Sequence, residues 1–358
     1  MGDMGEAQDW LFSPLRMIVG IHVLVALVAL VFALLAANAA WATDGVRKDP
    51  SADSRPRTAV PGFLLDRGRY VKFDAPGAQL ETAPLGINNR GRVVGNYIDA
   101  DADAPYHGFM RDRRGRITTI DIAGAKATVA SKINDQGQIV GRYYESTPFR
   151  PPDGRPRGFL LDHGCLTGID FPGAVFTQAV GINNRGHVVG EYLDRTGVFH
   201  GFLWKRGRFT TIDFPGAAAT SLVDVNDPGQ IIGIKLDADG AVHGFLLRDG
   251  DFTILDAPSA PYTFPRDINN RGQIAGFTLV DLDLTGARGF LLARGAKGPF
   301  TPIDVPGAPR NLVFGLNDRR QLVGTYENTD AATGPAPVDI QAMDMSPASG
   351  GGPPTGAD

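Results

Sequence analysis

The sequence predicts an all-β fold, a six-bladed β-propeller built from four-stranded repeats. Three observations support this prediction. A motif such as "GINNRGHVVGEY" recurs six times between residues 86 and 326, and a Gly-Phe pair opens six units that start 43 to 50 residues apart. No stretch from 60 to 327 has apolar residues at the spacing of a helix. A fixed period of this length indicates a repeat architecture, and four-stranded units of this length are typical of propeller blades.

The chain opens with an apolar segment that predicts export. Residues 17–42 contain no Asp, Glu, Lys or Arg, and Ala40-Trp41-Ala42 supplies the small residues of a signal peptidase site. The apolar core, residues 17–37, is also long enough to span a bilayer. Residues 1–42 are therefore either a cleaved signal peptide or a retained membrane anchor. Both interpretations place the rest of the chain outside the cytoplasm, as a secreted, periplasmic or cell-surface protein that contacts a membrane only through an uncleaved N-terminus.

Two further segments are predicted to lie outside the repeats. Residues 43–59 are polar with two prolines, which indicates a flexible linker. Residues 329–358 are rich in Gly and Pro without periodicity, which indicates a disordered tail. The predicted propeller covers residues 60–328, with repeats that start near residues 62, 108, 158, 201, 244 and 289.

Each repeat contains four short strands. In the fourth unit, "GFLW", "RFTTID", "SLVDVN" and "QIIGIKL" are rich in β-formers and are separated by the turn sequences "KRG", "FPGA" and "DPG". The only cysteine, Cys165, excludes an intramolecular disulfide and is interpreted as a small residue in a turn beside a strand. The core must therefore come from packing alone.

Spacing within the repeat predicts which parts are rigid. The Asp of the "ID-x-PG" motif precedes the motif Asn by 13 or 14 residues, whereas that Asn precedes the next Gly-Phe by 18 to 24. We expect a fixed second hairpin and a variable connection between blades, because surface loops absorb insertions. The Gly of "VVG" predicts a close backbone approach where neighbouring blades stack. The repeated Asn and Asp are interpreted as turn residues, and the alternative is rings of ligands around an axis.

The stretch "HGFLWKRGRFTTIDFPGAAATSLVDVNDPGQIIG" resembles the bacterial extracellular repeat named HAF, which runs from His-Ala-Phe to an "IN-D-x-G-Q-I-V-G" motif. The resemblance covers about residues 62–327. In this chain Gly replaces the Ala, and Arg157 and Arg288 replace the His in two units. The resemblance implies an exported, propeller-like repeat and implies no catalytic residues.

Composition and motifs exclude several classes of function. The net charge is −4 and no basic stripe is present, which argues against a nucleic-acid partner. No zinc-protease, hydrolase, phosphate-loop or paired-cysteine motif occurs, so no catalytic residue, cofactor or metal is predicted. The acids Asp99, Asp101 and Asp103 are interpreted as a solvated turn, because Ala104 stands where a calcium loop needs Gly. The repeated histidines His107, His200 and His243 are expected to be structural.

Candidate binding positions follow the framework Gly, where the repeats differ. The predicted binding residues are Asn96, Tyr97, Arg142, Tyr143, Glu191, Tyr192 and Tyr326. A scaffold that varies one site in each repeat can use these sites for recognition. The alternative is that these side chains fill gaps between blades.

The sequence thus predicts a monomeric, non-catalytic binding module for a polysaccharide or other surface polymer, or for a protein. The expected face carries the connections after the "VVG" strands, of which "YYESTPFRPPDGRPR" is the longest. The alternative is a metal-dependent hydrolase or lyase with its site in the propeller channel, where the repeated Asp and Asn would have to supply the ligands.

Overall fold

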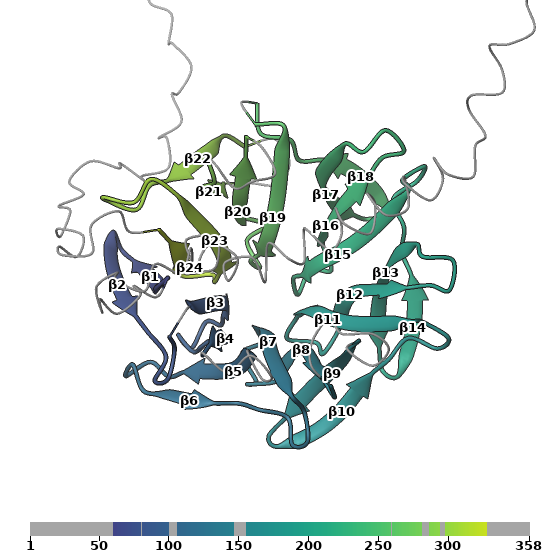
Figure 1. Ribbon diagram of the computed structural model, residues 1–358. Coiled ribbons are helices and arrows are strands. Elements are labelled where there is room, and N and C mark those ends of the chain that lie inside the picture. Colours follow the sequence, from purple (N-terminus) through teal and green to yellow (C-terminus); the bar gives the residue numbers. More distant parts are fainter. Residues whose placement is uncertain are drawn as a thin grey trace, which may run out of the picture.

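The computed structural model describes residues 60–79, 81–99, 106–146, 155–258, 260–280, 286–293 and 298–327. These residues form six four-stranded antiparallel sheets arranged in a ring, with no helix in the described ranges (Figure 1). The predicted six-bladed β-propeller is confirmed. The predicted N-terminal segment, linker and tail all lie outside the described residues. Within those residues, a search for helices able to cross a membrane finds none.

Each blade is named here by its strands from the axis outward. Blades 1 to 3 consist of β3 (Glu81–Ile87), β4 (Val93–Ile98), β5 (Tyr106–Arg111) and β6 (Ile117–Thr119); β7 (Ala127–Ile133), β8 (Ile139–Tyr144), β9 (Pro156–Asp162) and β10 (Cys165–Ile169); and β11 (Phe176–Ile182), β12 (Val188–Leu193), β13 (Phe199–Lys205) and β14 (Arg208–Thr211).

Blades 4 to 6 repeat this arrangement, although the last one joins the two ends of the ring. They consist of β15 (Ala219–Val225), β16 (Ile231–Leu236), β17 (Val242–Arg248) and β18 (Asp251–Ile254); β19 (Tyr262–Ile268), β20 (Ile274–Leu279), β21 (Arg288–Leu292) and β22 (Phe300–Ile303); and β23 (Asn311–Leu316), β24 (Leu322–Tyr326), β1 (Gly62–Asp66) and β2 (Arg69–Phe73).

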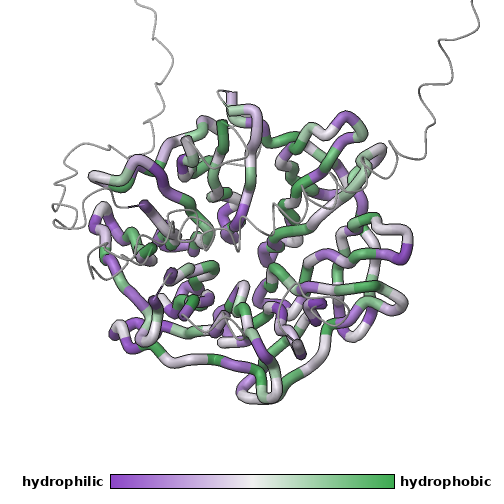
Figure 2. Tube along the Cα trace, viewed as in Figure 1, coloured by the Kyte–Doolittle hydropathy of each residue, from purple (hydrophilic) through white to green (hydrophobic). Residues whose placement is uncertain are grey.

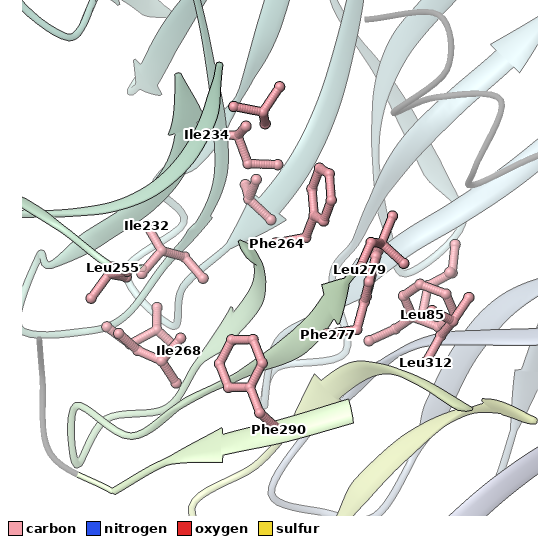
Figure 3. Packing of buried hydrophobic residues seen from close by; sticks show 14 of the residues in the cluster. Leu85, Ile232, Ile234, Leu255, Phe264, Ile268, Phe277, Leu279, Phe290 and Leu312 are labelled. Carbon is pink, nitrogen blue, oxygen red and sulfur yellow. The ribbon is translucent and has the colours of Figure 1, made fainter. Parts of the chain in front are cut away.

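Burial decreases from the axis to the rim. Every residue of β3 and β7 is buried, whereas β14 and β18 expose three of their four residues. Hydrophobic residues occur in all six blades (Figure 2). The largest apolar cluster joins several blades, and Ile232, Phe264, Phe277 and Leu312 belong to it (Figure 3). Stacking of one blade on the next therefore supplies the core, because a single four-stranded blade cannot bury both of its faces.

The ring is closed within blade 6. Strand β1, from the beginning of the described chain, pairs with β24 from its end, in the register Gly62↔Thr325 to Leu65↔Leu322. The sequence repeat is consequently out of phase with the blade, since each Gly-Phe pair lies in the third strand of a blade. Closure by backbone hydrogen bonds leaves no open sheet edge at the junction.

The predicted location of the variable connection was wrong. The constant segment, from the "ID" motif to the Asn, links the outer strand of one blade to the inner strand of the next, as in β6 to β7. The variable segment includes the connection between the second and third strands of one blade, such as β8 to β9. The physical reason is that stacked blades need a constant crossing, whereas this hairpin ends at the surface and tolerates insertions.

The predicted reason for the repeated Gly was also wrong. A Cβ on Gly95 would lie 2.0 Å from the carbonyl oxygen of Ala83 and 2.9 Å from the ring of Phe109, both in the same blade. The close approach is therefore within the blade. It occurs beside a register shift between Pro84 and Gly86, which the other inner strands share. Such a bulge leaves one extra residue outside the ladder and re-aims its side chain.

Candidate functional site

Six Asn residues that follow the inner strands form a closed ring of hydrogen bonds around the axis. The Nδ2 group of each donates to the main-chain carbonyl of the equivalent Asn in the next blade, over 2.9 to 3.2 Å. The ring consists of Asn88, Asn134, Asn183, Asn226, Asn269 and Asn317. Their Oδ1 atoms accept N–H groups of their own turns. The turn interpretation is confirmed, and the same side chains also link the blades.

A second ring alternates Asn with Asp at the next position. It consists of Asn89, Asp135, Asn184, Asp227, Asn270 and Asp318. Each Asp Oδ2 accepts from the Nδ2 groups of both neighbouring Asn residues, over 2.8 to 3.2 Å. Each main-chain N–H donates to the Oδ1 atom of the next residue around the ring. Each Asn amide donates its two hydrogens to the Asp residues on either side, and each Asp accepts from both of its Asn neighbours. Such an alternation of Asn and Asp can close only in a ring with an even number of blades.

Both rings surround the mouth of an axial cavity of about 70 Å³, and three charged side chains lie in it. Lys132 Nζ lies 2.5 Å from Asp267 Oδ2 and 3.5 Å from Asp224 Oδ2. Burial, together with the charge of Asp224, raises the pKa of Asp267 well above its usual value, although Lys132 opposes this rise. The other three blades have Gly at the equivalent position, namely Gly86, Gly181 and Gly315. A Cβ on Gly86 would lie 3.1 Å from Lys132 Cδ, so the missing side chain makes room for the lysine.

Deeper in the channel, a smaller cavity of about 20 Å³ is lined by both polar and apolar residues. We call this cavity the chamber. All six bulge residues line it, namely Leu85, Ser131, Val180, Val223, Arg266 and Phe314. The remaining lining residues are Lys132, Arg142, Gln178, Ser221 and Ile234. The bulges thus aim two hydrogen-bond donors, Ser131 and Arg266, and four apolar side chains at the axis.

Glu191 lies beside the chamber and is completely buried. Its Oε1 atom accepts a hydrogen bond of 2.7 Å from Gln178 Nε2. Burial raises the pKa of Glu191 to about 8, against the opposing effects of Ser221, Arg142 and Gln178. This carboxyl group therefore holds a proton near neutral pH, and it does not supply a full negative charge to the neighbouring arginines.

A groove of about 420 Å³ lies at the junction of blades 2 and 3. It is lined by Glu145, Arg155, Pro156, Arg157, Asp170, Phe171, Ala174, Val175, Phe176 and Thr177. Arg157 bridges two acids, with Nε 3.3 Å from Glu145 Oε2 and Nη1 3.6 Å from Asp170 Oδ2. The groove lies on the face away from the rings, because β8 starts near the Asn ring and ends at Tyr144.

The repeated His residues join the ends of three strands. His107 Nδ1 lies 2.9 Å from Asp121 Oδ2, after β6, and its Nε2 lies 3.1 Å from Asp99 Oδ2, after β4. The corresponding distances from His200 to Asp213 and Asp194 are 2.8 and 3.5 Å. His243 repeats the arrangement, and Arg157 occupies the same place in blade 2. These contacts agree with the structural role that is expected for the histidines.

The structure divides the seven predicted binding residues among different places. Arg142 lines the chamber and Glu191 lies beside it. Tyr143 is near the groove, since burial and then Glu145 raise the pKa of its hydroxyl. Tyr192 is also near the groove, because its ring stacks on that of Phe171 with centroids 3.7 Å apart.

The other three predicted residues lie within the packing of blades 1 and 6. Asn96 is only 2% exposed. Tyr97 stacks on His107 with ring centroids 5.0 Å apart, and Tyr326 lies 6.3 Å from the ring of Phe63. These residues are not brought together with the other four.

Four residues that line these cavities, Lys132, Asp224, Asp267 and Arg266, are not among the residues predicted from the sequence. A signal for the first three was present, since they precede the repeated Asn by two residues where the other units have Gly. Arg266 gave no such signal, because only the bulge turns its side chain toward the axis.

The acids are arranged for hydrogen bonding rather than for metal binding. In the described ranges, no group of three or more His, Cys, Asp and Glu side chains could hold a metal ion. The carboxylates of the second ring already accept hydrogen bonds from Asn amides on both sides. Of the alternating acids, Asp99 contacts His107, whereas Asp101 and Asp103 lie outside the described residues.

No protein-family model and no curated protein matches this chain. Among solved structures, it is similar to a putative TolB from Agrobacterium tumefaciens, with a TM-score of 0.54 and 12% identity over 75% of this chain and 99% of that one. TolB from Acinetobacter baumannii gives a TM-score of 0.46 and 12% identity, over 76% of this chain and 65% of that one. A fucose-specific lectin from Aleuria aurantia gives a TM-score of 0.42 and 12% identity, over 66% of this chain and 86% of that one. At these identities the likeness concerns the propeller fold alone.

Proposed function

We propose that this chain is an exported, non-catalytic binding module that holds a surface polymer or a protein in the groove between blades 2 and 3. The observation that carries this proposal is the groove itself. Its charged residues flank the longest of the connections after a "VVG" strand, and such connections are the variable part of an otherwise constant repeat. Variation concentrated on one face of a rigid scaffold is typical of recognition sites.

The chemistry of the groove fits a partner with charged and hydrogen-bonding groups. Arg155 and Arg157 are exposed, and their planar guanidinium groups suit carboxylate or other oxyanion groups of a ligand. Glu145 and Asp170 hold Arg157 in place and offer acceptors for hydroxyl or amide groups. Neighbouring Tyr143 and Tyr192 support the groove from β8 and β12.

The competing function, a metal-dependent hydrolase or lyase in the channel, is supported less well. It would need oxygen ligands that converge on the axis with free lone pairs. The ring carboxylates are instead engaged with Asn amides, and Lys132 lies between Asp224 and Asp267.

Export is part of the same proposal and is supported by the pattern of residues 1–42. The resemblance to the HAF repeat agrees with it. Fractionation, followed by mass spectrometry of the mature N-terminus, tests it. A terminus at Thr43 indicates cleavage, an intact N-terminus in the membrane fraction indicates an anchor, and a cytoplasmic product contradicts export.

Binding is tested with the purified protein on arrays of surface polysaccharides and of peptides, followed by interferometry on each hit. The double variant Arg155→Ala/Arg157→Ala should lower the affinity at least tenfold. The matched control Arg113→Ala/Arg208→Ala removes the same charge from exposed positions that do not line the groove and should have no effect. Arrays without a hit, or hits that are insensitive to the groove variant, would contradict the proposal.

A further inference from the structure

The chamber concentrates hydrogen-bond donors in an enclosed space. Its polar lining residues include Arg142, Arg266, Ser131 and Ser221. Apolar side chains such as Leu85, Val223 and Phe314 lie between them around the axis. Buried cations are costly unless a partner of opposite charge accompanies them.

Arg266 forms no salt bridge with the residues that the structure describes, although the charges of Glu191, Asp224 and Asp267 act on it. It is 9% exposed, and its Nε has no hydrogen-bond partner among the residues that the structure describes. Its guanidinium lies 5.9 Å from the centroid of the Phe314 ring. Burial, and then repulsion by Arg142, lower its pKa to about 10, which shows that the nearby acids do not compensate its charge fully.

Arg142 donates a hydrogen bond to an uncharged side chain. Its Nε donates 3.2 Å to the hydroxyl oxygen of Tyr144, which is a neutral group. Three neighbouring acids also have other partners. Glu191 accepts from Gln178, and burial favours its protonated form, while Asp224 and Asp267 contact Lys132. Arg142 and Arg266 thus both line the chamber, and Arg266 has a buried donor that no described residue accepts.

We propose that the chamber binds one small monovalent anion, of the size of a halide, between Arg142 and Arg266. A volume of about 20 Å³ holds one or two water-sized groups, so larger oxyanions are excluded. The apolar lining residues favour an anion that gives up its hydration easily. Arg142 belongs to β8 of blade 2 and Arg266 to β19 of blade 5, so the anion ties opposite sides of the ring together.

Thermal unfolding of the purified full-length protein tests this proposal. Sodium chloride, bromide or gluconate is titrated at constant ionic strength, and gluconate serves as the anion that is too large to enter. Chloride and bromide should raise the midpoint with the logarithm of their concentration above the dissociation constant, by about 5 °C at one hundred times that constant. Gluconate should leave it unchanged. A midpoint that is the same in all three salts would overturn the proposal, since the chamber would then hold water only.

Variants locate the effect. Arg266→Gln should abolish the shift caused by chloride and bromide, whereas Arg208→Gln, an exposed substitution on β14, should retain it. Glu191→Gln keeps the shape of the protonated acid and should also retain the shift. A shift that survives in Arg266→Gln would place the anion elsewhere and contradict the proposal. If Arg266→Gln does not fold, anomalous diffraction from bromide-soaked wild-type crystals decides, because a peak between the two arginines supports the site and peaks at the surface alone refute it.

Discussion

The side-chain amide of Asn317 donates a hydrogen bond of 3.0 Å to the main-chain carbonyl of Asn88, which lies 229 positions earlier in the chain. This bond repeats the contact that equivalent residues make between neighbouring blades. The last blade therefore meets the first one through the same polar link as any other pair. Closure of the ring depends on this link, on the pairing of β1 with β24 and on the alternating second ring.

The first prediction concerns that second ring. Asp318→Asn places an amide between Asn89 and Asn270, so two donated hydrogens lose their carboxylate acceptor. The expected loss is about 1 to 3 kcal/mol in the free energy of unfolding, measured by urea denaturation. Asp251→Asn, the same change at an exposed rim position, should have almost no effect. Equal effects for the two variants would show that the alternation is not important for stability.

The second prediction concerns the repeated Gly. Gly190→Ala would place a Cβ 2.0 Å from the carbonyl oxygen of Gln178 and 3.0 Å from the ring of Phe202. Since backbone and a packed ring must both move, we expect a destabilisation of about 3 kcal/mol or loss of folding. At Gly168 the nearest atom would be a flexible carboxylate at 3.6 Å, so Gly168→Ala serves as the control. A Gly190→Ala protein with the midpoint of the wild type would refute the proposed role of this Gly.

The third prediction uses the raised pKa of Glu191, about 8. The folded protein keeps this proton while the unfolded chain releases it near the ordinary value of 4.5. The contribution of the protonated Glu191 to the free energy of unfolding is therefore complete below pH 4.5 and is lost as the pH rises to about 8. Glu191→Gln removes this dependence. The variant should gain stability relative to the wild type across that window, on the order of 5 kcal/mol at its upper end.

Urea denaturation of both proteins at a series of pH values checks this expectation. Glu145→Gln, an exposed acid of the same kind, is the control and should run parallel to the wild type. A constant difference between Glu191→Gln and the wild type from pH 4.5 to 8 would contradict the raised pKa.

The fourth prediction compares two histidines with opposite shifts. Burial opposes charging of His107, but the hydrogen bonds and charges of Asp121 and Asp99 outweigh burial and raise its pKa. The contribution of His107 to the free energy of unfolding is therefore complete below pH 6.5. It is lost as the pH rises through the pKa that His107 has in the folded protein. Burial, reinforced by Lys205 and Arg185, lowers the pKa of His187, so its folded state loses stability as the pH falls below 6.5.

Substitution should reveal these opposite signs. His107→Gln should destabilise more at pH 5.5 than at pH 8, whereas His187→Gln should destabilise less at pH 5.5 than at pH 8. Thermal midpoints at the two pH values measure both differences. The same pH trend in both variants would mean that the carboxylates around His107 do not set its protonation.

Periodicity predicted the fold correctly because the propeller is assembled from one local pattern. Short β-rich runs, the turns between them and the period of the repeat are all properties of neighbouring residues. The structural role of the repeated His was equally visible, since it recurs at one position of each unit. The alternation of Asn-Asn and Asn-Asp in successive motifs was also present in the sequence, although its meaning depends on the closed ring.

Only the tertiary structure decided which residues face the axis and how the ring closes. Closure pairs β1 with β24, and nothing local to either strand specifies that partner. The bulge turns Arg266 into the chamber, and only the ring brings it toward Arg142 from the opposite blade. The roles of Glu191 and Lys132 follow from burial and from charges contributed by other blades. These long-range contacts are absent from any single repeat, so the sequence determined the blade while the packing of six blades created the sites.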